Sequence, residues 1–545
     1  MTFLQIFTAI TPILLVLIFL VIMRLPAIKA MPLSWLVHAL LAIFIWQVPL
    51  KIIGAASIEG LIIAVSVLWI IFGAILLLNV LKTSGALETI RSSFMQISKD
   101  RRVQAILIAW VFGGFLEGAS GFGTPAAICA PILIAVGFPP LAAVVLALIG
   151  NGIPVTYGGI GTTFLVGTTQ GLQQAAATAP IVSQYLGGTS LVEFVQTVSA
   201  KSALLNILPG TLIPLIISAF LTRFFGPNKS WKEGLAVWKF ALLAGFSFTG
   251  VSALIATMAG PEFPSLFGGL ITLIIMIPIA KKGYLLPKEV WDFDNQPEQN
   301  MSTPEKLNPM PLWKAWLPYI LVTFLLVITR LRFLPFKSWL SDIPLGWSHI
   351  LGTEISTSFA PFYSPGFILV VTSLLVMIFF RLTGQQIKNT FSVSGKSILI
   401  SGITLGTAVP LVRIFINSSI NAAGLDSMPI ALAETMAEAV GPLWPLVSPF
   451  IGALGAFVSG SATFSNLMFT LFQFGAALQN GFDPINIVAL QTIGAALGNM
   501  ICVVNVVAAS SVVGLQGQEG RIIRYTVGPS LALCLLVGVM VLVGG

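Results

Sequence analysis

The chain has 545 residues, of which 56% are hydrophobic and only 8% are charged. A soluble globular domain carries about 25% charged residues, so most of this chain is expected to lie in a lipid bilayer. The net charge of +8 does not indicate a nucleic-acid partner. The basic residues lie in short loops between apolar runs, where they orient helices by the positive-inside rule.

A spanning helix needs about 20 apolar residues. The first run, 4–23, lacks a basic leader segment and a small-residue cleavage site, so it is predicted to be a spanning helix rather than a removed signal. Two regions, 103–172 and 441–516, are apolar but interrupted by Gly, Pro, Asn, Ser and Thr. The other full-length candidates are 31–50, 60–81, 203–222, 236–259, 264–280, 315–330, 364–380, 397–419 and 526–543.

The charges of the loops give an orientation. The loop 82–102 holds five basic residues against two acidic ones, which places it in the cytoplasm and, by counting spans, places both termini outside. The number of crossings agrees with the loop charges only if each interrupted region contains a hairpin that returns to its own side, followed by a broken helix that crosses the membrane. The predicted fold is therefore a single all-α transmembrane domain, 1–545, with about 12 transmembrane helices, two hairpins and broken helices.

The two interrupted regions repeat weakly. Phe115-Leu-Glu-Gly-Ala-Ser matches Phe457-Val-Ser-Gly-Ser-Ala in pattern, and Gly150-Asn151 is echoed by Gly498-Asn499. The hairpins enter from opposite sides, which predicts an inverted repeat with cores at 103–222 and 397–543 and a site at their interface. Chance matches in Gly-rich sequence are the alternative.

The first hairpin tip is the stretch Gly113-Gly-Phe-Leu-Glu-Gly-Ala-Ser-Gly-Phe-Gly-Thr-Pro125, which carries the lone carboxylate Glu117. Backbone at membrane depth leaves helix geometry only where protein or a water-filled cavity satisfies its polar groups. A Gly-rich break with an ionisable residue therefore indicates a substrate or ion site. Burial favours the neutral form of a carboxyl group, so Glu117 is a candidate proton carrier. The alternative is a carboxylate that holds the glycine loop by accepting backbone N–H bonds.

Both tips also indicate an anion site. Thr124 is predicted as a helix N-cap with Pro125 at the first helical position, and Ser461 or Thr463 as the N-cap of the second tip. Helix starts offer free N–H groups and a positive dipole end to a carboxylate, unless the hydroxyls only cap their own helices. The candidate substrate-binding residues are Ser120, Gly121, Gly123, Thr124, Asn151, Tyr157, Thr162, Thr163, Arg413, Ser459, Ser461, Thr463, Ser465, Asn466, Asn499 and Asn505.

Among these, Arg413 is the one arginine well inside an apolar run, and it is expected either to contact substrate or to stabilise the fold. No ATP-binding loop, HExxH motif, Cys/His cluster or GxSxG elbow is found. We therefore expect no catalytic residues, no metal and no cofactor, and a transporter rather than an enzyme.

Four motifs resemble the bacterial lactate permease family. They are Gly114-Phe-Leu-Glu-Gly-Ala-Ser-Gly-Phe-Gly-Thr-Pro125, Asn421-Ala-Ala-Gly-Leu-Asp-Ser-Met-Pro429, Ser459-Gly-Ser-Ala-Thr-Phe-Ser-Asn466 and Val513-Gly-Leu-Gln-Gly-Gln-Glu-Gly520. The resemblance implies a secondary carrier in the bacterial inner membrane that moves lactate or glycolate together with a proton. Its partners would be a small carboxylate, a proton and the lipid bilayer, and the oligomeric state stays open.

The chain departs from the family pattern at two positions. Ala462 stands where some members carry an acidic or amide residue, and Asn499 stands where others often carry Lys. The first departure shifts proton coupling towards Glu117, and the second leaves substrate binding to Arg413 or to neutral donors. A sodium-coupled carrier of another organic anion and a passive anion channel are the alternative functions.

Overall fold

A computed structural model describes residues 2–23, 25–95, 97–121, 123–174, 177–293, 310–330, 334–515 and 517–544. These residues are mostly helical, which confirms the all-α part of the predicted fold. The α-helices of the first half are α1 (Phe3–Val16), α2 (Ala27–Phe44), α3 (Leu50–Thr83), α4 (Ala86–Met95), α5 (Arg101–Ala105), α6 (Gly113–Ala119), α7 (Thr124–Ala135), α8 (Pro140–Asn151), α9 (Gly158–Thr162), α10 (Thr169–Gly171), α11 (Pro180–Leu186), α12 (Leu191–Phe220), α13 (Trp231–Leu235), α14 (Trp238–Ala259) and α15 (Pro264–Lys281).

The second half continues the helical pattern, and short non-α turns interrupt both halves. Its helices are α16 (Leu312–Arg330), α17 (Phe336–Ser341), α18 (Pro365–Phe379), α19 (Gly384–Ile416), α20 (Met428–Val440), α21 (Trp444–Ser459), α22 (Ala462–Gln479), α23 (Pro484–Gly498), α24 (Val503–Ser511) and α25 (Glu519–Gly544). The π-helical turns are Leu17–Ile22, Ile106–Phe112, Thr163–Thr168 and Leu221–Phe225, and the 3-10 turns are Pro154–Tyr157, Ile350–Gly352, Asn417–Ser419 and Gly441–Leu443.

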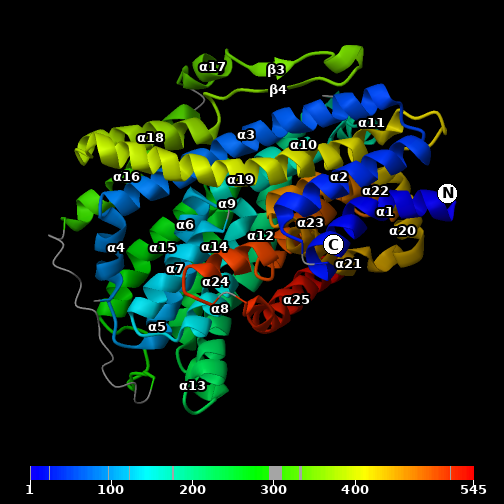
Figure 1. Ribbon diagram of the computed structural model, residues 1–545. Helices are drawn as coiled ribbons and strands as arrows, with labels where there is room; N and C mark the ends of the chain where they lie inside the picture. Colours follow the sequence, from blue (N-terminus) through cyan, green and yellow to red (C-terminus); the bar gives the residue numbers. More distant parts are fainter. Residues whose placement is uncertain are drawn as a thin grey trace.

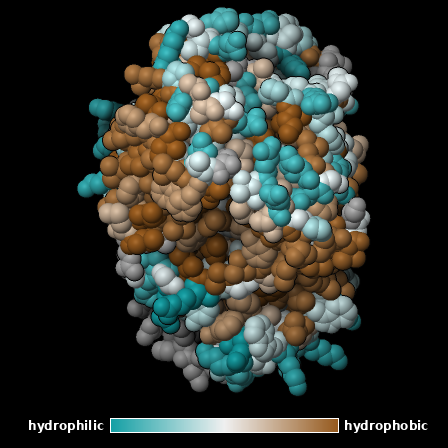
Figure 2. All heavy atoms as spheres, turned by 90° about the vertical axis from the view of Figure 1, so that its right-hand side faces the viewer, coloured by the Kyte–Doolittle hydropathy of each residue, from teal (hydrophilic) through white to brown (hydrophobic). Residues whose placement is uncertain are grey.

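Within the described part of the chain, 11 helices are long and apolar enough to cross a membrane. The number becomes 12 if the pair Pro140–Asn151 and Pro154–Gly171, bent by 53°, forms one span. The prediction of about 12 spans with a broken one is confirmed to this extent. Exposed apolar side chains cover much of the face in Figure 2, with hydrophilic residues gathered towards its top and bottom. Such a large apolar surface is typical of a protein that contacts lipid.

Several predicted helix bounds were wrong, and two of them show the physical reason. The span expected at 31–50 ends at Phe44, because the chain turns at Gln47, which has a φ of 58°, before Pro49 starts α3. The span expected at 397–419 begins at Gly384, because Thr383 and Gln386 form a capping box that starts α19 earlier. Capping by polar residues therefore extended a helix beyond its apolar run.

The longest helices, α3 and α19, pack side by side along one edge of the molecule (Figure 1). Their backbones approach closely at Gly60, where an added Cβ would overlap the backbone of Pro410. The antiparallel pair β3 (Leu345–Trp347) and β4 (Thr357–Phe359) lies over α3. A shorter pair, β1 (Gln173–Gln174) and β2 (Ala177–Thr178), follows α10.

The two interrupted regions share a close helix–helix contact made at a glycine. In the first region, Gly150 of α8 lies against the backbone of Ala109 in the preceding hairpin leg. In the second, Gly498 of α23 lies against the backbone of Ala453 in α21. At both positions a side chain would overlap the neighbouring backbone, so glycine allows each broken helix to pack closely on its hairpin.

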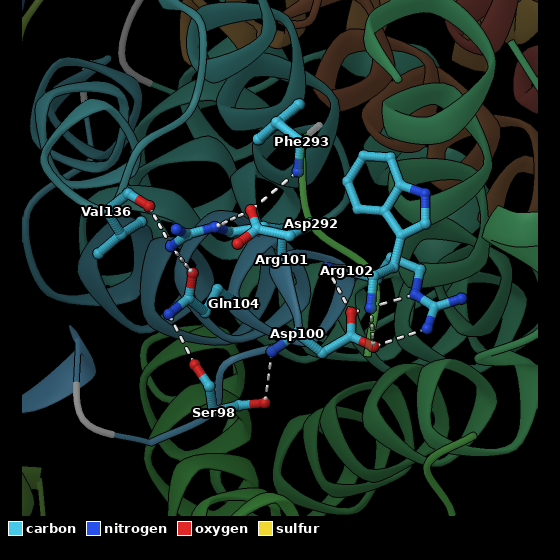
Figure 3. A network of polar contacts seen from close by, with 9 residues as sticks. Ser98, Asp100, Arg101, Arg102, Gln104, Val136, Asp292 and Phe293 are labelled. Carbon is cyan, nitrogen blue, oxygen red and sulfur yellow. Dashed lines mark hydrogen bonds and ion pairs between the residues drawn. The ribbon is translucent and has the colours of Figure 1, made fainter. Parts of the chain in front are cut away.

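A polar network fixes the base of the first hairpin (Figure 3). Asp100 caps the start of α5 and pairs with Arg102 at 2.6 Å, with both side chains buried. Arg101 pairs with Asp292 at 2.8 Å and donates to the carbonyl of Val136, at the end of α7. The network therefore joins the entry and the exit of the hairpin to the segment that follows α15.

Candidate functional site

The first tip places Glu117 inside the protein. Glu117 lies on α6 and is 2% exposed, and its Oε2 atom is buried without a hydrogen-bond partner. The amide of Asn151, at the end of α8, hydrogen-bonds to the same side chain. Gly158 also lies against this carboxyl group, because a Cβ there would overlap Glu117 Oε1. The carboxyl group is thus held between the hairpin and the broken helix.

The broken helix is unwound next to Glu117. After α8 the chain forms the 3-10 turn Pro154–Tyr157 and then takes left-handed φ values of 53° at Gly159, 58° at Ile160 and 70° at Gly161. A β-branched residue rarely adopts positive φ, so Ile160 is a strained position. The surrounding structure keeps Ile160 in this conformation, and strained backbone positions occur often at functional sites.

The helix at the first tip starts differently from the prediction. Gly123 is the N-cap with a φ of 74°, Thr124 is already the first helical residue, and no side chain caps the helix. At the second tip Ser461 occupies the N-cap position as predicted, but its hydroxyl makes no capping bond. The first N–H groups of a helix have no intrahelical partner. The start of α22 can therefore offer backbone N–H groups to a ligand, whereas in α7 the Thr124 N–H donates to the Gly121 carbonyl at 3.1 Å and Pro125 has no N–H.

The two interrupted regions meet at these tips. Thr162 and Thr463 face each other, with their hydroxyl oxygens 3.3 Å apart. Gly123 lies so close to Asn505 that a Cβ would overlap its Oδ1. Asn505 in turn donates to Asn499 Oδ1 at 2.7 Å. Residues more than 300 positions apart in the chain thus form one site.

A cavity of about 340 Å³ opens at this meeting point. Small-molecule sites begin at about 300 Å³. Part of the wall is apolar and is contributed by residues of α3 and α19 that the sequence did not single out, such as Val67 and Leu405. Ten of the predicted substrate or proton residues line the cavity, namely Glu117, Gly123, Thr124, Thr162, Thr163, Ser459, Ser461, Thr463, Asn499 and Asn505.

The charge of the cavity wall is unusual for an anion site. Among the described residues that line it, Glu117 is the only acidic one, and no Arg, Lys or His is present. The other polar groups are hydroxyls and amides. Such a wall can hydrogen-bond a small polar ligand, but it does not offer a basic side chain to neutralise an anion.

Several predicted residues lie behind the cavity wall instead of in it. Asn466 donates to the carbonyl of Thr163 at 3.2 Å and to Thr492 at 3.1 Å, and Tyr157 donates to the carbonyl of Ser199 at 2.5 Å. These bonds brace the elements that carry the cavity residues. The predicted residues outside the wall are Ser120, Gly121, Asn151, Tyr157, Arg413, Ser465 and Asn466.

Arg413 forms a buried ion pair. Its Nη2 lies 2.5 Å from Glu59 Oε1, and the two side chains are 0% and 2% exposed. Its Nη1 donates to the carbonyl of Gln170 at 2.9 Å, and Asn417 donates to Glu59 Oε2 at 2.6 Å. Glu59 was missed in the sequence, although it is the one acidic residue in the apolar run of α3. The cluster links α3 and α19 to the end of the first broken helix.

The sequence comparisons with known proteins point to one family. The family model described as L-lactate permease matches residues 5–544. The L-lactate permease of Bacillus subtilis is 27% identical over 536 residues, covering 91% of this chain and 88% of its own length. The L-lactate permease of Escherichia coli K12 is 27% identical over 537 residues, with 93% and 90% covered, and its glycolate permease GlcA is 27% identical over 573 residues, with 98% and 94% covered.

Among solved structures, the YdaH transporter of Alcanivorax borkumensis matches with a TM-score of 0.28 and 16% identity, covering 73% of this chain and 88% of that one. The family match extends over nearly the whole chain, and the described helices are those of a multi-pass membrane protein. The chain therefore belongs to the L-lactate permease family, and it is a transporter rather than an enzyme.

Proposed function

We propose that this protein imports lactate, glycolate or a related 2-hydroxymonocarboxylate by proton symport across the bacterial inner membrane. The observation that carries the proposal is the cavity wall, in which Glu117 is the only charged residue among those described. A carboxylate substrate that binds there meets a second carboxyl group and no basic side chain. Binding of the anion therefore favours protonation of the site.

The size of this effect follows from electrostatics. Two carboxylates about 4 Å apart repel each other by about 4 kcal/mol at an effective dielectric constant of about 20. A proton on Glu117 removes this repulsion and provides a hydrogen-bond donor for the substrate. The buried and unpartnered Oε2 atom of Glu117 is the atom on which this proton would lie. Substrate and proton would thus bind together and cross without net charge.

The substrate carboxylate would lie between the two uncapped helix starts, α7 at Thr124 and α22 at Ala462. The N–H groups at the start of α22 and the positive dipole ends of both helices favour an anion. The substrate hydroxyl would bond to side chains such as Thr162, Thr463 and Asn499, which line the cavity. The predicted site residues outside the cavity wall would act indirectly, by positioning the residues that line the cavity.

The architecture would be an inverted repeat with cores at 103–222 and 397–543, each with a hairpin and a broken helix, and with both termini outside. The shared packing of Gly150 on Ala109 and of Gly498 on Ala453 supports this arrangement. In secondary transporters of this kind, the substrate site lies near the midplane, where the repeats meet.

Uptake of labelled L-lactate and glycolate into proteoliposomes tests the proposal. We expect accumulation that is driven by an inward proton gradient and is insensitive to a sodium gradient. Accumulation that needs sodium would favour a sodium-coupled carrier. Equilibration without accumulation under any gradient would favour a passive channel, and the absence of any transport of either acid would refute the substrate assignment.

A further inference from the structure

The wall of the proposed substrate cavity changes in chemistry from one element to the next. Its carboxyl group, its amides and most of its hydroxyl groups come from the hairpin tips and the broken helices. The long helices α3 and α19 contribute six aliphatic side chains, which together form the aliphatic wall, namely Val67, Ile71, Ala74, Ile75, Leu405 and Val409. One part of the cavity is therefore polar and another part is aliphatic.

The helices α3 and α19 present the aliphatic wall together, because they pack side by side (Figure 1). An added Cβ at Gly402 of α19 would lie 3.8 Å from Leu68 Cδ1 of α3. Ser401 also lines the cavity from α19, but its hydroxyl donates to the carbonyl of Ser397 at 3.2 Å, one turn earlier. Because this hydrogen is used within the helix, the wall offers a ligand mostly van der Waals contact.

The polar groups of the cavity lie close to one another at the tips. The hydroxyl oxygens of Thr162 and Thr463 are 3.3 Å apart, and Asn505 Nδ2 donates to Asn499 Oδ1 at 2.7 Å. Since Asn499 accepts this bond through its oxygen, its Nδ2 hydrogens can be donated to a ligand in the cavity. These groups suit the carboxylate and the hydroxyl of a 2-hydroxy acid. The side chain of such an acid is then left to the aliphatic part of the cavity.

The cavity is large for glycolate or lactate. A volume of about 340 Å³ has room for about eleven water molecules at about 30 Å³ each. Glycolate has no apolar side chain and lactate has only a methyl group, so either acid leaves most of the aliphatic wall in contact with water. Contact of apolar surface with water is unfavourable, and small-molecule sites bury most of the surface of their ligand. A longer aliphatic side chain fills this space and displaces the water.

Given the proposed transport of 2-hydroxymonocarboxylates, on which this assignment rests, we propose that the protein also carries members of this class with a branched aliphatic side chain. Examples are 2-hydroxyisovalerate and 2-hydroxyisocaproate. The aliphatic wall binds the side chain of these acids, and the polar groups at the tips bind the carboxylate and the hydroxyl. The partly buried wall residues Ile75 and Leu405 set the length of the side chain that fits.

Exchange in proteoliposomes without a pH gradient tests this assignment, because passive permeation of the longer acids then dissipates no driving force. Vesicles loaded with labelled L-lactate are diluted into buffer with unlabelled L-lactate, 2-hydroxyisovalerate or 2-hydroxyisocaproate, and the efflux of label is measured. An external acid that is carried accelerates this efflux, whereas an acid that only blocks the site slows it. Isocaproate, which lacks the hydroxyl group, is the matched control for the polar part of the ligand.

The expected preference follows from burial of the side chain. Each buried CH₂ group strengthens binding about fourfold. We expect 2-hydroxyisocaproate to accelerate efflux with a half-maximal concentration at least about fivefold below that of external L-lactate. Isocaproate should not accelerate efflux, because it offers no hydroxyl to the polar groups at the tips.

Two variants assign the preference to the aliphatic wall. Ile75→Trp and Leu405→Trp each fill part of the cavity, and each should raise the half-maximal concentration of 2-hydroxyisocaproate at least about tenfold while that of L-lactate changes less than about threefold. Val65→Trp on α3 and Ile403→Trp on α19 are the matched controls, because these side chains are 54% and 48% exposed and neither lines the cavity. Both controls should keep the preference for the longer acid.

Uptake of labelled L-lactate and glycolate by the wild type separates the two assignments. Absence of uptake of both acids refutes the proposed function and the assignment that rests on it. Lactate exchange that 2-hydroxyisocaproate slows or leaves unchanged refutes only the assignment of the longer acids. Acceleration by 2-hydroxyisocaproate that persists undiminished in both Ile75→Trp and Leu405→Trp overturns the role of the aliphatic wall.

Discussion

Separate and joint replacement of Glu59 and Arg413 tests whether this buried pair supports the fold rather than the substrate. Arg413 is fully buried, and its Nη2 lies 2.5 Å from Glu59 Oε1. Glu59→Gln leaves the guanidinium group without its counter-ion, and Arg413→Met leaves the carboxylate with only the bond from Asn417 to Glu59 Oε2. Each single change therefore creates an uncompensated buried charge.

The magnitude follows from this burial. Removal of one partner of a buried ion pair costs about 3–5 kcal/mol, whereas replacement of both by neutral groups is often close to neutral. We expect each single variant to lose about 3–4 kcal/mol of the free energy of unfolding. The double variant should lose about 1–2 kcal/mol, because the amide oxygen that Glu59→Gln introduces can still accept from Asn417. The double loss should thus be smaller than either single loss.

The assay is denaturant unfolding of the detergent-purified protein, with L-lactate uptake measured on the same preparations. Asp292→Asn serves as the control, because the Arg101–Asp292 pair is 23% and 56% exposed and should contribute less than about 1 kcal/mol. Additive losses in the double variant would refute the buried-pair reasoning. Normal stability of Arg413→Met together with a large rise in KM would instead assign Arg413 to the substrate, as the sequence allowed.

Two further predictions follow from close contacts at the site. Gly158→Ala places a methyl group on Glu117 Oε1, so the initial rate of lactate uptake should fall at least tenfold at unchanged protein level, whereas Gly402→Ala, whose nearest neighbour is a Leu68 atom at 3.8 Å, should keep its rate. Asn466→Ala removes the donor to the Thr163 carbonyl inside the core and should lower the free energy of unfolding by about 1–3 kcal/mol. An unchanged rate in the first variant, or unchanged stability in the second, would contradict the packing described.

The candidate site could be predicted in part because polar residues are costly in a membrane. Glu117 and the polar residues of the interrupted regions stand out against an apolar chain, and the structure brings ten predicted residues together around one cavity. The apolar wall from α3 and α19 could not be found in this way, since residues such as Val67 are ordinary for a spanning helix. A cavity wall of this kind depends on which helices pack together.

The sequence also could not predict which charged residues pair with each other across the chain. Glu59 and Arg413 are 354 positions apart, and each lies within an apolar stretch of its helix. The start of α7 was misplaced by one residue, because the left-handed Gly123, rather than the hydroxyl of Thr124, begins the helix. Pairs β1–β2 and β3–β4 lie in connecting segments without strong alternation of polar and apolar residues, so they carried no strand signal.

Proton movement during L-lactate uptake is the most direct test of the proposed coupling through Glu117. A pH-sensitive dye inside proteoliposomes should report acidification when lactate enters the wild type and the exposed control Glu193→Gln. Glu117→Gln should abolish acidification and accumulation, while exchange of internal for external lactate continues. Lactate-driven acidification that persists in Glu117→Gln would contradict the account, because the proton would then cross by another group.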